Sequence, residues 1–201
     1  MATVLSGFRP VKHMNGSLYN GQVNRYMLSA DDSQVTNVGD LVILSDQAAL
    51  VDTSGGVYPC VERAASATSS AIVGAIVGFE PDYSNLNTGM YRAASTRRVA
   101  LVADASDLIF ACSQDGTGGV VAAASVGLNC SLVIGTGAST APYLSTMKVD
   151  SSEVDTTATD PIQIMGVLAS PDNDVTSTSR PAELLVRINT HAFNAAGLAG
   201  V

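Results

Sequence analysis

Few residues in this chain have the types and the spacing that catalysis or metal binding requires. Its two histidines, His13 and His191, lie near opposite ends of the sequence. Neither has a cysteine, a carboxylate or a second histidine at a metal-ligand spacing. Asp172 and Asp174 form a pair that could hold Ca²⁺ or act as acid and base, but aspartates in such stretches usually cap turns with their own side chains. We therefore expect no catalytic residue, no metal site and no cofactor.

The glycine-rich stretches have the composition of phosphate-binding loops but not their context. Residues 115–119 (DGTGG) and 135–137 (GTG) are followed by no helical pattern whose N-terminus would hold an anion. The sequence also contains no P-loop, no G-x-G-x-x-G motif and no G-x-S-x-G nucleophile elbow. These stretches are predicted to be turns between strands, and the chain is predicted not to be an enzyme.

The three cysteines, Cys60, Cys112 and Cys130, are odd in number and lack metal-ligand spacing. We expect them to be buried as small apolar side chains in a reducing compartment.

The charge and hydrophobicity of the chain argue against nucleic acid and membranes as partners. With 10 basic and 18 acidic residues the net charge is −8, which disfavours binding of nucleic acid through a basic face. Hydrophobic residues make up 46% of the 201-residue chain and charged residues only 14%, which is typical of a folded domain rather than a disordered one. The longest uncharged run, residues 116–147, is interrupted throughout by Gly, Ser, Thr and Asn. No membrane-spanning helix and no membrane partner are expected.

Short apolar runs alternate with turn-forming clusters of Gly, Asp, Pro and Ser. This spacing predicts an all-β fold, a β-barrel or β-sandwich of short antiparallel strands. The Ala-rich residues 63–75 are compatible with one helix or with a loop. The predicted strands are residues 38–44, 72–79, 98–103, 108–112, 131–134, 162–168 and 184–188.

The two halves of the chain resemble each other, which favours a pseudo-duplicated fold. Residues 73–82 (VGAIVGFEPD) and 165–174 (MGVLASPDND) both combine a glycine, an apolar strand and Pro-Asp. Each is preceded by a Val-Gly pair, at Val38-Gly39 and at Val126-Gly127, and a Leu-Val-Ile run follows each pair, residues 41–43 and 132–134. Two such halves would pack as a pseudo-symmetric barrel or sandwich, although chance similarity among Val/Gly-rich strands gives nearly the same pattern.

The first part of the chain differs from the rest. Residues 7–28 contain two Asn-Gly turn signals and concentrate aromatic and basic side chains in an otherwise acidic protein. We interpret them as an extended N-terminal arm that docks on a partner; an ordinary hairpin at the domain edge is the alternative. The predicted organisation is an arm over residues 1–30, a β-barrel or sandwich over 31–190, and a C-terminal tail over 191–201.

The predicted partner contacts in the arm are chosen by residue type and position. They are Phe8, Arg9, Lys12, Tyr19, Arg25 and Tyr26.

Several segments resemble a known family, the capsid decoration (cement) proteins of tailed bacteriophages. The similarity extends from about residue 7 to about residue 193, and it consists of strand and turn patterns rather than catalytic motifs. The segments are residues 7–16 (GFRPVKHMNG), 19–23 (YNGQV), 38–42 (VGDLV), 76–82 (IVGFEPD), 91–96 (YRAAST), and 165–168 (MGVL) leading to 171–173 (PDN).

The resemblance implies a structural protein on the outer surface of the virion. It would bind the phage major capsid protein, clamp neighbouring capsid subunits and stabilise the icosahedral head. It would also associate with itself, as a homotrimer more readily than as a homodimer. Residues 116–147 are the candidate self-association segment, with plain core and neutral loops as the alternative. A surface of Ser, Thr and Gly suits such contacts because charged residues would cost desolvation.

Other functions are compatible with the same sequence. Within the virion, the chain could instead be a head–tail connector or a tail protein. A surface-exposed module that binds glycans or a host receptor is a further alternative, although the chain contains no Trp for an aromatic platform.

Overall fold

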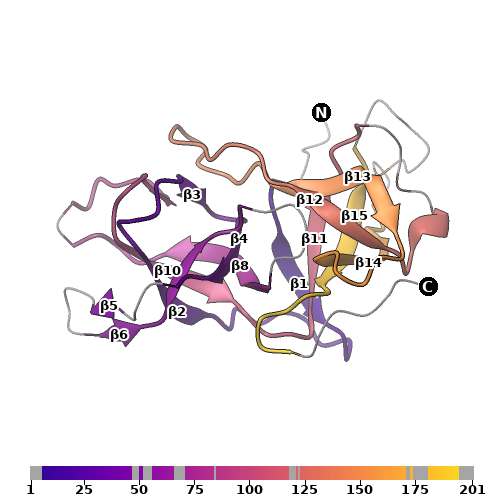
Figure 1. Cartoon of the computed structure of the whole chain (residues 1–201), viewed down its shortest axis with the longest axis horizontal. Helices are drawn as coiled ribbons and strands as arrows, with labels where there is room; N and C mark the ends of the chain where they lie inside the picture. Colours follow the sequence, from indigo (N-terminus) through magenta and orange to yellow (C-terminus); the bar gives the residue numbers. More distant parts are fainter. Residues whose placement is uncertain are drawn as a thin grey trace.

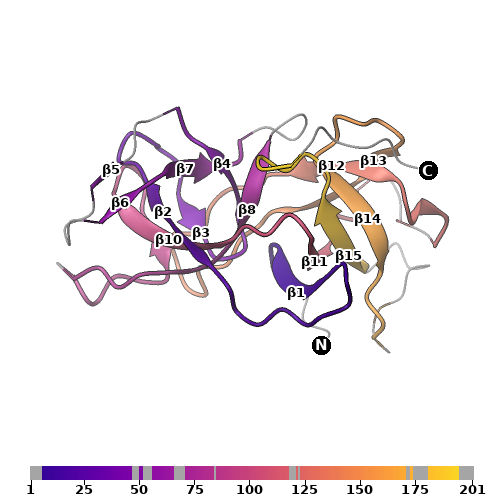
Figure 2. The same cartoon turned by 90° about the horizontal axis from the view of Figure 1, so that it is seen from below.

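The computed structural model describes residues 6–46, 50–51, 56–65, 71–83, 85–117, 121, 123–170, 173 and 181–194. Within them the chain is almost entirely β, as predicted, with one short 3₁₀ turn, η1 (Ala123–Ser125). Two β units lie side by side and give the molecule an elongated shape (Figures 1 and 2). We call them the N-terminal barrel and the C-terminal sheet.

The N-terminal barrel is closed and has the strand order β10-β2-β7-β4-β8. Two small antiparallel pairs extend from it, β3 (Thr36–Asn37) with β9 (Tyr91–Arg92) and β5 (Leu50–Val51) with β6 (Val57–Tyr58). The barrel strands are β2 (Asn24–Leu28), β4 (Leu41–Leu44), β7 (Cys60–Arg63), β8 (Ile72–Phe79) and β10 (Arg98–Ala103).

The C-terminal sheet has six strands in the order β1-β11-β15-β14-β12-β13, and every neighbouring pair is antiparallel. An isolated parallel bridge between Gln114 and Val149 joins the end of β11 to β13, so the sheet curls back on itself. Its strands are β1 (Arg9–His13), β11 (Leu108–Ser113), β12 (Asn129–Val133), β13 (Lys148–Asp155), β14 (Ile162–Val167) and β15 (Glu183–Ile188).

The two units repeat one topology, as the sequence similarity of the two halves suggested. In chain order β2, β4, β7, β8 and β10 correspond to β11, β12, β13, β14 and β15. In both units the last strand pairs with the first and the fourth, the fourth pairs with the second, and the second pairs with the third, always antiparallel. In both, the first and third strands meet in parallel, as β2 with β7 and through the Gln114–Val149 bridge. Strand β1 is the one addition to the sheet.

The repeat extends to single residues at one corner of each unit. Gly39 and Gly127 both have positive φ, +91° and +96°. The amide of Gly39 donates to the Ile76 carbonyl at 2.8 Å, and the amide of Gly127 donates to the Ile164 carbonyl at 2.8 Å. A left-handed residue turns the chain into the second strand at the same place in both units, and glycine adopts that conformation without steric cost.

The shared topology also determines which residues of the two units correspond. In the β8–β10 pair the register shifts between the partners of Leu101 and Val102, and in the β14–β15 pair it shifts between Ile164 and Gly166. These bulges make Gly78 correspond to Gly166. The sequence similarity matched these two strands without giving their register, because a Val/Gly-rich strand gives similar patterns at several offsets.

The two units share one buried hydrophobic cluster, and the barrel has a second cluster of its own. Leu41, Ile72 and Ala103 on barrel strands pack in the same buried cluster as Phe110 and Leu132 of the sheet. All five are at most 2% exposed. Each fully buried large aliphatic or aromatic side chain contributes roughly 1.5–3 kcal/mol, so this cluster stabilises the junction between the units.

The N-terminal segment does not form a separate arm. Strand β1 pairs with β11 of the sheet, and β2 pairs with β10 and β7 of the barrel. Residues 9–28 therefore cross from one unit to the other and contribute a strand to each (Figure 2). The predicted start of the C-terminal tail at residue 191 is also corrected, because His191 is buried and forms a parallel bridge with Ile72. Residues 195–201 lie outside the described residues.

Two other expectations are corrected. Strand β13 was not predicted, because its sequence KVDSSEVD is polar. Residues 63–75 contribute the end of β7 and the start of β8, and no helix occurs among their described positions; residues 66–70 lie outside the described part. No helix in the described ranges is long and apolar enough to cross a membrane.

Candidate functional site

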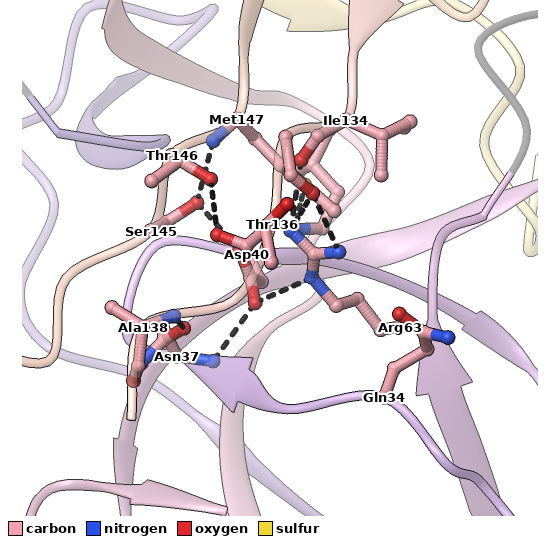
Figure 3. A network of polar contacts seen from close by, with 12 residues as sticks. Gln34, Asn37, Asp40, Arg63, Ile134, Thr136, Ala138, Ser145, Thr146 and Met147 are labelled. Carbon is pink, nitrogen blue, oxygen red and sulfur yellow. Dashed lines mark hydrogen bonds and ion pairs between the residues drawn. The ribbon is translucent and has the colours of Figure 1, made fainter. Parts of the chain in front are cut away.

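A buried polar network ties the two units together (Figure 3). Arg63 on β7 donates from Nε to Asp40 Oδ2 at 2.9 Å and from Nη2 to the carbonyl of Ile134 at 2.8 Å. Asp40 Oδ1 accepts the hydroxyl of Ser145 at 2.5 Å. Burial raises the pKa of Asp40, and Arg63, Ser145 and the amide of Asn37 oppose that rise. The network, which we call the latch, holds the loop of residues 134–147 from the C-terminal half against the barrel.

A groove of about 550 Å³ lies where the two units meet. It is mainly apolar, and Arg9 is the one charged side chain among the described residues that line it. The latch positions one wall, because the amide of Ser145 donates to the Val38 carbonyl at 3.0 Å and so fixes the neighbouring Leu144. The apolar lining consists of Phe8, Pro10, Val38, Ile76, Val77 and Leu144.

The loop between β8 and β9 lies at the far end of the barrel (Figures 1 and 2), and it carries exposed apolar side chains. Tyr83 is 76% exposed and Leu86 is 78% exposed. Both occupy turns, since the amide of Asn85 donates to the Asp82 carbonyl and the amide of Thr88 donates to the Asn85 carbonyl, each at 3.1 Å. We call Tyr83 and Leu86 together the knob.

One buried arginine fixes both ends of that loop. Arg98 donates from Nη1 to the carbonyls of Gly89 at 2.6 Å and Tyr91 at 2.5 Å, and from Nε to the carbonyl of Glu80 at 3.2 Å. Its guanidinium lies 5.0 Å from the ring centroid of Phe79. Burial lowers the pKa of Arg98, but an arginine remains charged at any physiological pH. The exposed knob is therefore built on a rigid base.

Two of the six predicted contact residues are core side chains. Phe8 is 1% exposed, and Tyr26 is 4% exposed. Tyr26 donates from its hydroxyl to Asp104 at 2.6 Å, and burial together with that carboxylate raises the pKa of Tyr26. Their aromatic character is accounted for by packing, so these two residues are corrected from contact candidates to core residues.

The other four candidates are accessible but do not form one cluster. Arg9 and Tyr19 line the groove. Lys12 is half-buried on β1. Arg25 is exposed and pairs with Glu80 at 2.5 Å beside a second, shallow hollow of about 740 Å³ that Tyr58 also lines. Whether any of them contacts a partner stays a prediction.

Sequence reasoning missed the knob and the exposed walls of the groove. Tyr83 and Leu86 lie in residues 80–90 (EPDYSNLNTGM), where large apolar side chains interrupt a stretch of turn-forming residues. Such side chains have no core to enter in a turn, and that pattern was the available signal. Val77 and Leu144 gave no comparable signal, because their exposure depends on the bulge in β8 and on the latch.

Groups with catalytic potential are not assembled in the described residues. The three thiols are buried, and burial raises the pKa of Cys112, which keeps that thiol protonated. His13 and Asp107 form an isolated pair with Nδ1 and Oδ1 3.0 Å apart. No group of three His, Cys, Asp or Glu side chains in the described part could hold a metal ion.

Comparison with protein-family models, with curated proteins and with solved structures gave no match. The function is therefore argued from the geometry of this chain.

Proposed function

We propose that this protein is a capsid decoration protein, which binds the outer surface of a phage head and clamps neighbouring major capsid subunits. The observation that carries the proposal is the course of residues 9–28, which lie along both β units. Arg9, Lys12 and Arg25 on that segment place three basic groups across the two units of an acidic chain.

The duplicated fold supports a clamping role. A shell presents copies of one subunit at regular spacing, and a protein with two similar units offers a similar surface to each of two neighbours. The latch and the shared core hold those units at a fixed separation. A rigid two-unit body loses little conformational freedom on binding, and many adjacent weak contacts together stabilise a shell strongly.

Co-sedimentation with undecorated, expanded heads tests the proposal, with stoichiometry from densitometry. We expect saturable binding near one copy per capsid subunit. Failure of the folded protein to bind heads would overturn the decoration role. Binding to tail complexes, or a virion copy number in the tens rather than the hundreds, would instead favour a connector or tail component.

Charge-reversal variants test the proposed contact face. The double variant Lys12→Glu, Arg25→Glu should weaken head binding about tenfold or more, mainly through slower association, because rim charges steer encounter. The matched control is Arg97→Glu, Lys148→Glu, which makes the same charge change on β13 and on the loop before β10. Equal weakening by both pairs would mean that net charge, and not this face, governs binding.

A further inference from the structure

We propose that this protein associates with itself head to tail, with the knob of one copy inserted into the groove of the next. The contact requires no capsid, so its test is independent of the decoration role. It joins two features that the described surface leaves uncovered within one chain, the exposed Tyr83 and Leu86 and the apolar groove between the units.

The knob has the properties of an interface anchor. Large, exposed, adjacent apolar side chains are uncommon at the tip of a polar loop, and tyrosine is among the residues that most often dominate binding energy. The loop that carries them is held at both ends by Arg98 and by successive turns. The two ends of the loop are therefore fixed before binding.

The groove has the complementary properties. A volume of about 550 Å³ lies within the roughly 300–1,000 Å³ of sites that enclose compact ligands, which is enough for the two knob side chains. Val77 and Leu144 on its walls are both more than a third exposed. Contact with a second apolar surface would remove them from water, and their positions are fixed by β8 and by the latch.

The charges of the two surfaces are complementary. The loop of residues 80–90 carries Asp82, together with Glu80, which already pairs with Arg25 of the same chain, and it carries no basic residue. The described lining of the groove carries Arg9 and no acidic residue. Copies with a net charge of −8 repel one another, and a contact that brings Asp82 near Arg9 offsets part of that repulsion.

The positions of the two surfaces determine the type of assembly. The knob lies at the end of the barrel and the groove lies at the junction of barrel and sheet, so the interface joins different patches of two copies. Such an interface repeats from copy to copy and closes into a ring when the rotation allows. We therefore expect an oligomer in which each copy offers its knob to one neighbour and its groove to another.

Sedimentation of the full chain without capsids is the first test. At roughly 100 μM a contact of micromolar Kd is nearly saturated, and we expect a discrete oligomer. Leu86→Glu and Leu144→Glu should each weaken association about 30-fold or more, the usual effect of losing an anchor. Val57→Glu is the matched control, because Val57 is also exposed near the end of the barrel and lies outside both surfaces. A monomer at this concentration, or an equal effect of the control, would overturn the proposal.

Cysteine pairing tests the same contact directly. Leu86→Cys and Leu144→Cys chains, mixed and oxidised in air, should form a disulfide-linked heterodimer, while each variant alone should not. The native Cys60, Cys112 and Cys130 are buried and provide no competing thiol. Melting curves that match the wild type show that the exposed substitutions leave the fold intact. Absence of the cross-link in the mixture of folded variants would contradict the knob-in-groove contact.

Discussion

Arg63 Nε lies 2.9 Å from Asp40 Oδ2, and both side chains are almost completely inaccessible to solvent. The pair joins strand β7 to the turn before β4 within the barrel. The remaining guanidinium nitrogens of Arg63 donate to the carbonyls of Ile134 and Gly135 in the C-terminal half. One ion pair therefore organises both the closure of the barrel and its attachment to the second unit.

Asp40→Asn should lower the free energy of unfolding by about 3 kcal/mol, because it leaves the Arg63 charge buried without its counter-ion. At this chain length the melting temperature should fall by roughly 6–12 °C. Urea and thermal denaturation measure both quantities. Glu153→Gln, which changes an exposed carboxylate on β13, should have little effect. A loss below about 1 kcal/mol for Asp40→Asn would show that the pair is not needed for the latch.

Gly39→Ala should destabilise the protein by about 2–3 kcal/mol. Its φ of +91° disfavours alanine, which alone costs roughly 1–2 kcal/mol. The added Cβ would also lie 3.2 Å from Gly7 Cα and from Ser145 Cβ. The matched control is Gly16→Ala, at φ +90° with open space around the site. Urea denaturation should show a larger loss for Gly39→Ala, and equal losses would mean that the corner tolerates the contact.

The fold class followed from the sequence because burial imposes a pattern on each strand. Residues 72–79 and 98–103 form β8 and β10 with the predicted bounds, since both are apolar on two faces and are bounded by turn residues. Strand β13 lacks that pattern, because its outer half is exposed and polar. The order of strands in each unit depends on contacts between distant residues, which no local pattern specifies.

The arm interpretation failed because aromatic and basic residues serve two purposes in a strand. Phe8 and Tyr26 fill the core, while Arg9 and Arg25 beside them are exposed. Successive strand residues point to opposite faces. A strand within the fold can therefore combine buried aromatic residues with exposed basic ones, which is the composition that was taken for an arm. The groove depended on tertiary structure, because it combines β1, β8 and the latched loop from three parts of the chain.

Deletion of residues 1–28 should abolish cooperative folding. The deletion removes β2, which pairs with both β10 and β7, and β1, which covers the edge of β11. Circular dichroism and thermal melting of the full and shortened chains measure the effect. A two-glycine insertion after Asn20, in an exposed connection between the two strands, is the control and should preserve the transition. A shortened chain that melts cooperatively near the wild-type temperature would restore the arm interpretation.

Stability should fall as pH rises from about 4 to about 6, in part because of Asp160. Burial, together with the neighbouring carboxylates of Asp155 and Glu153, raises the pKa of Asp160 from 3.8 to about 6. Between these values the folded state holds a proton that the unfolded state has released, so a higher pH favours unfolding. Below pH 4 the group is protonated in both states and has no destabilising effect.

Asp160→Asn should remove this dependence, because the amide cannot ionise. The free energy of unfolding of the variant should exceed that of the wild type increasingly as pH rises, by roughly 1–3 kcal/mol at pH 8. Unfolding free energies at pH 4.5, 6 and 8 measure the gain. Asp155→Asn should flatten the same window more weakly, since it removes one of the charges that raise the pKa of Asp160. Parallel stability curves for the wild type and Asp160→Asn would show that Asp160 ionises at its ordinary pKa in the folded protein.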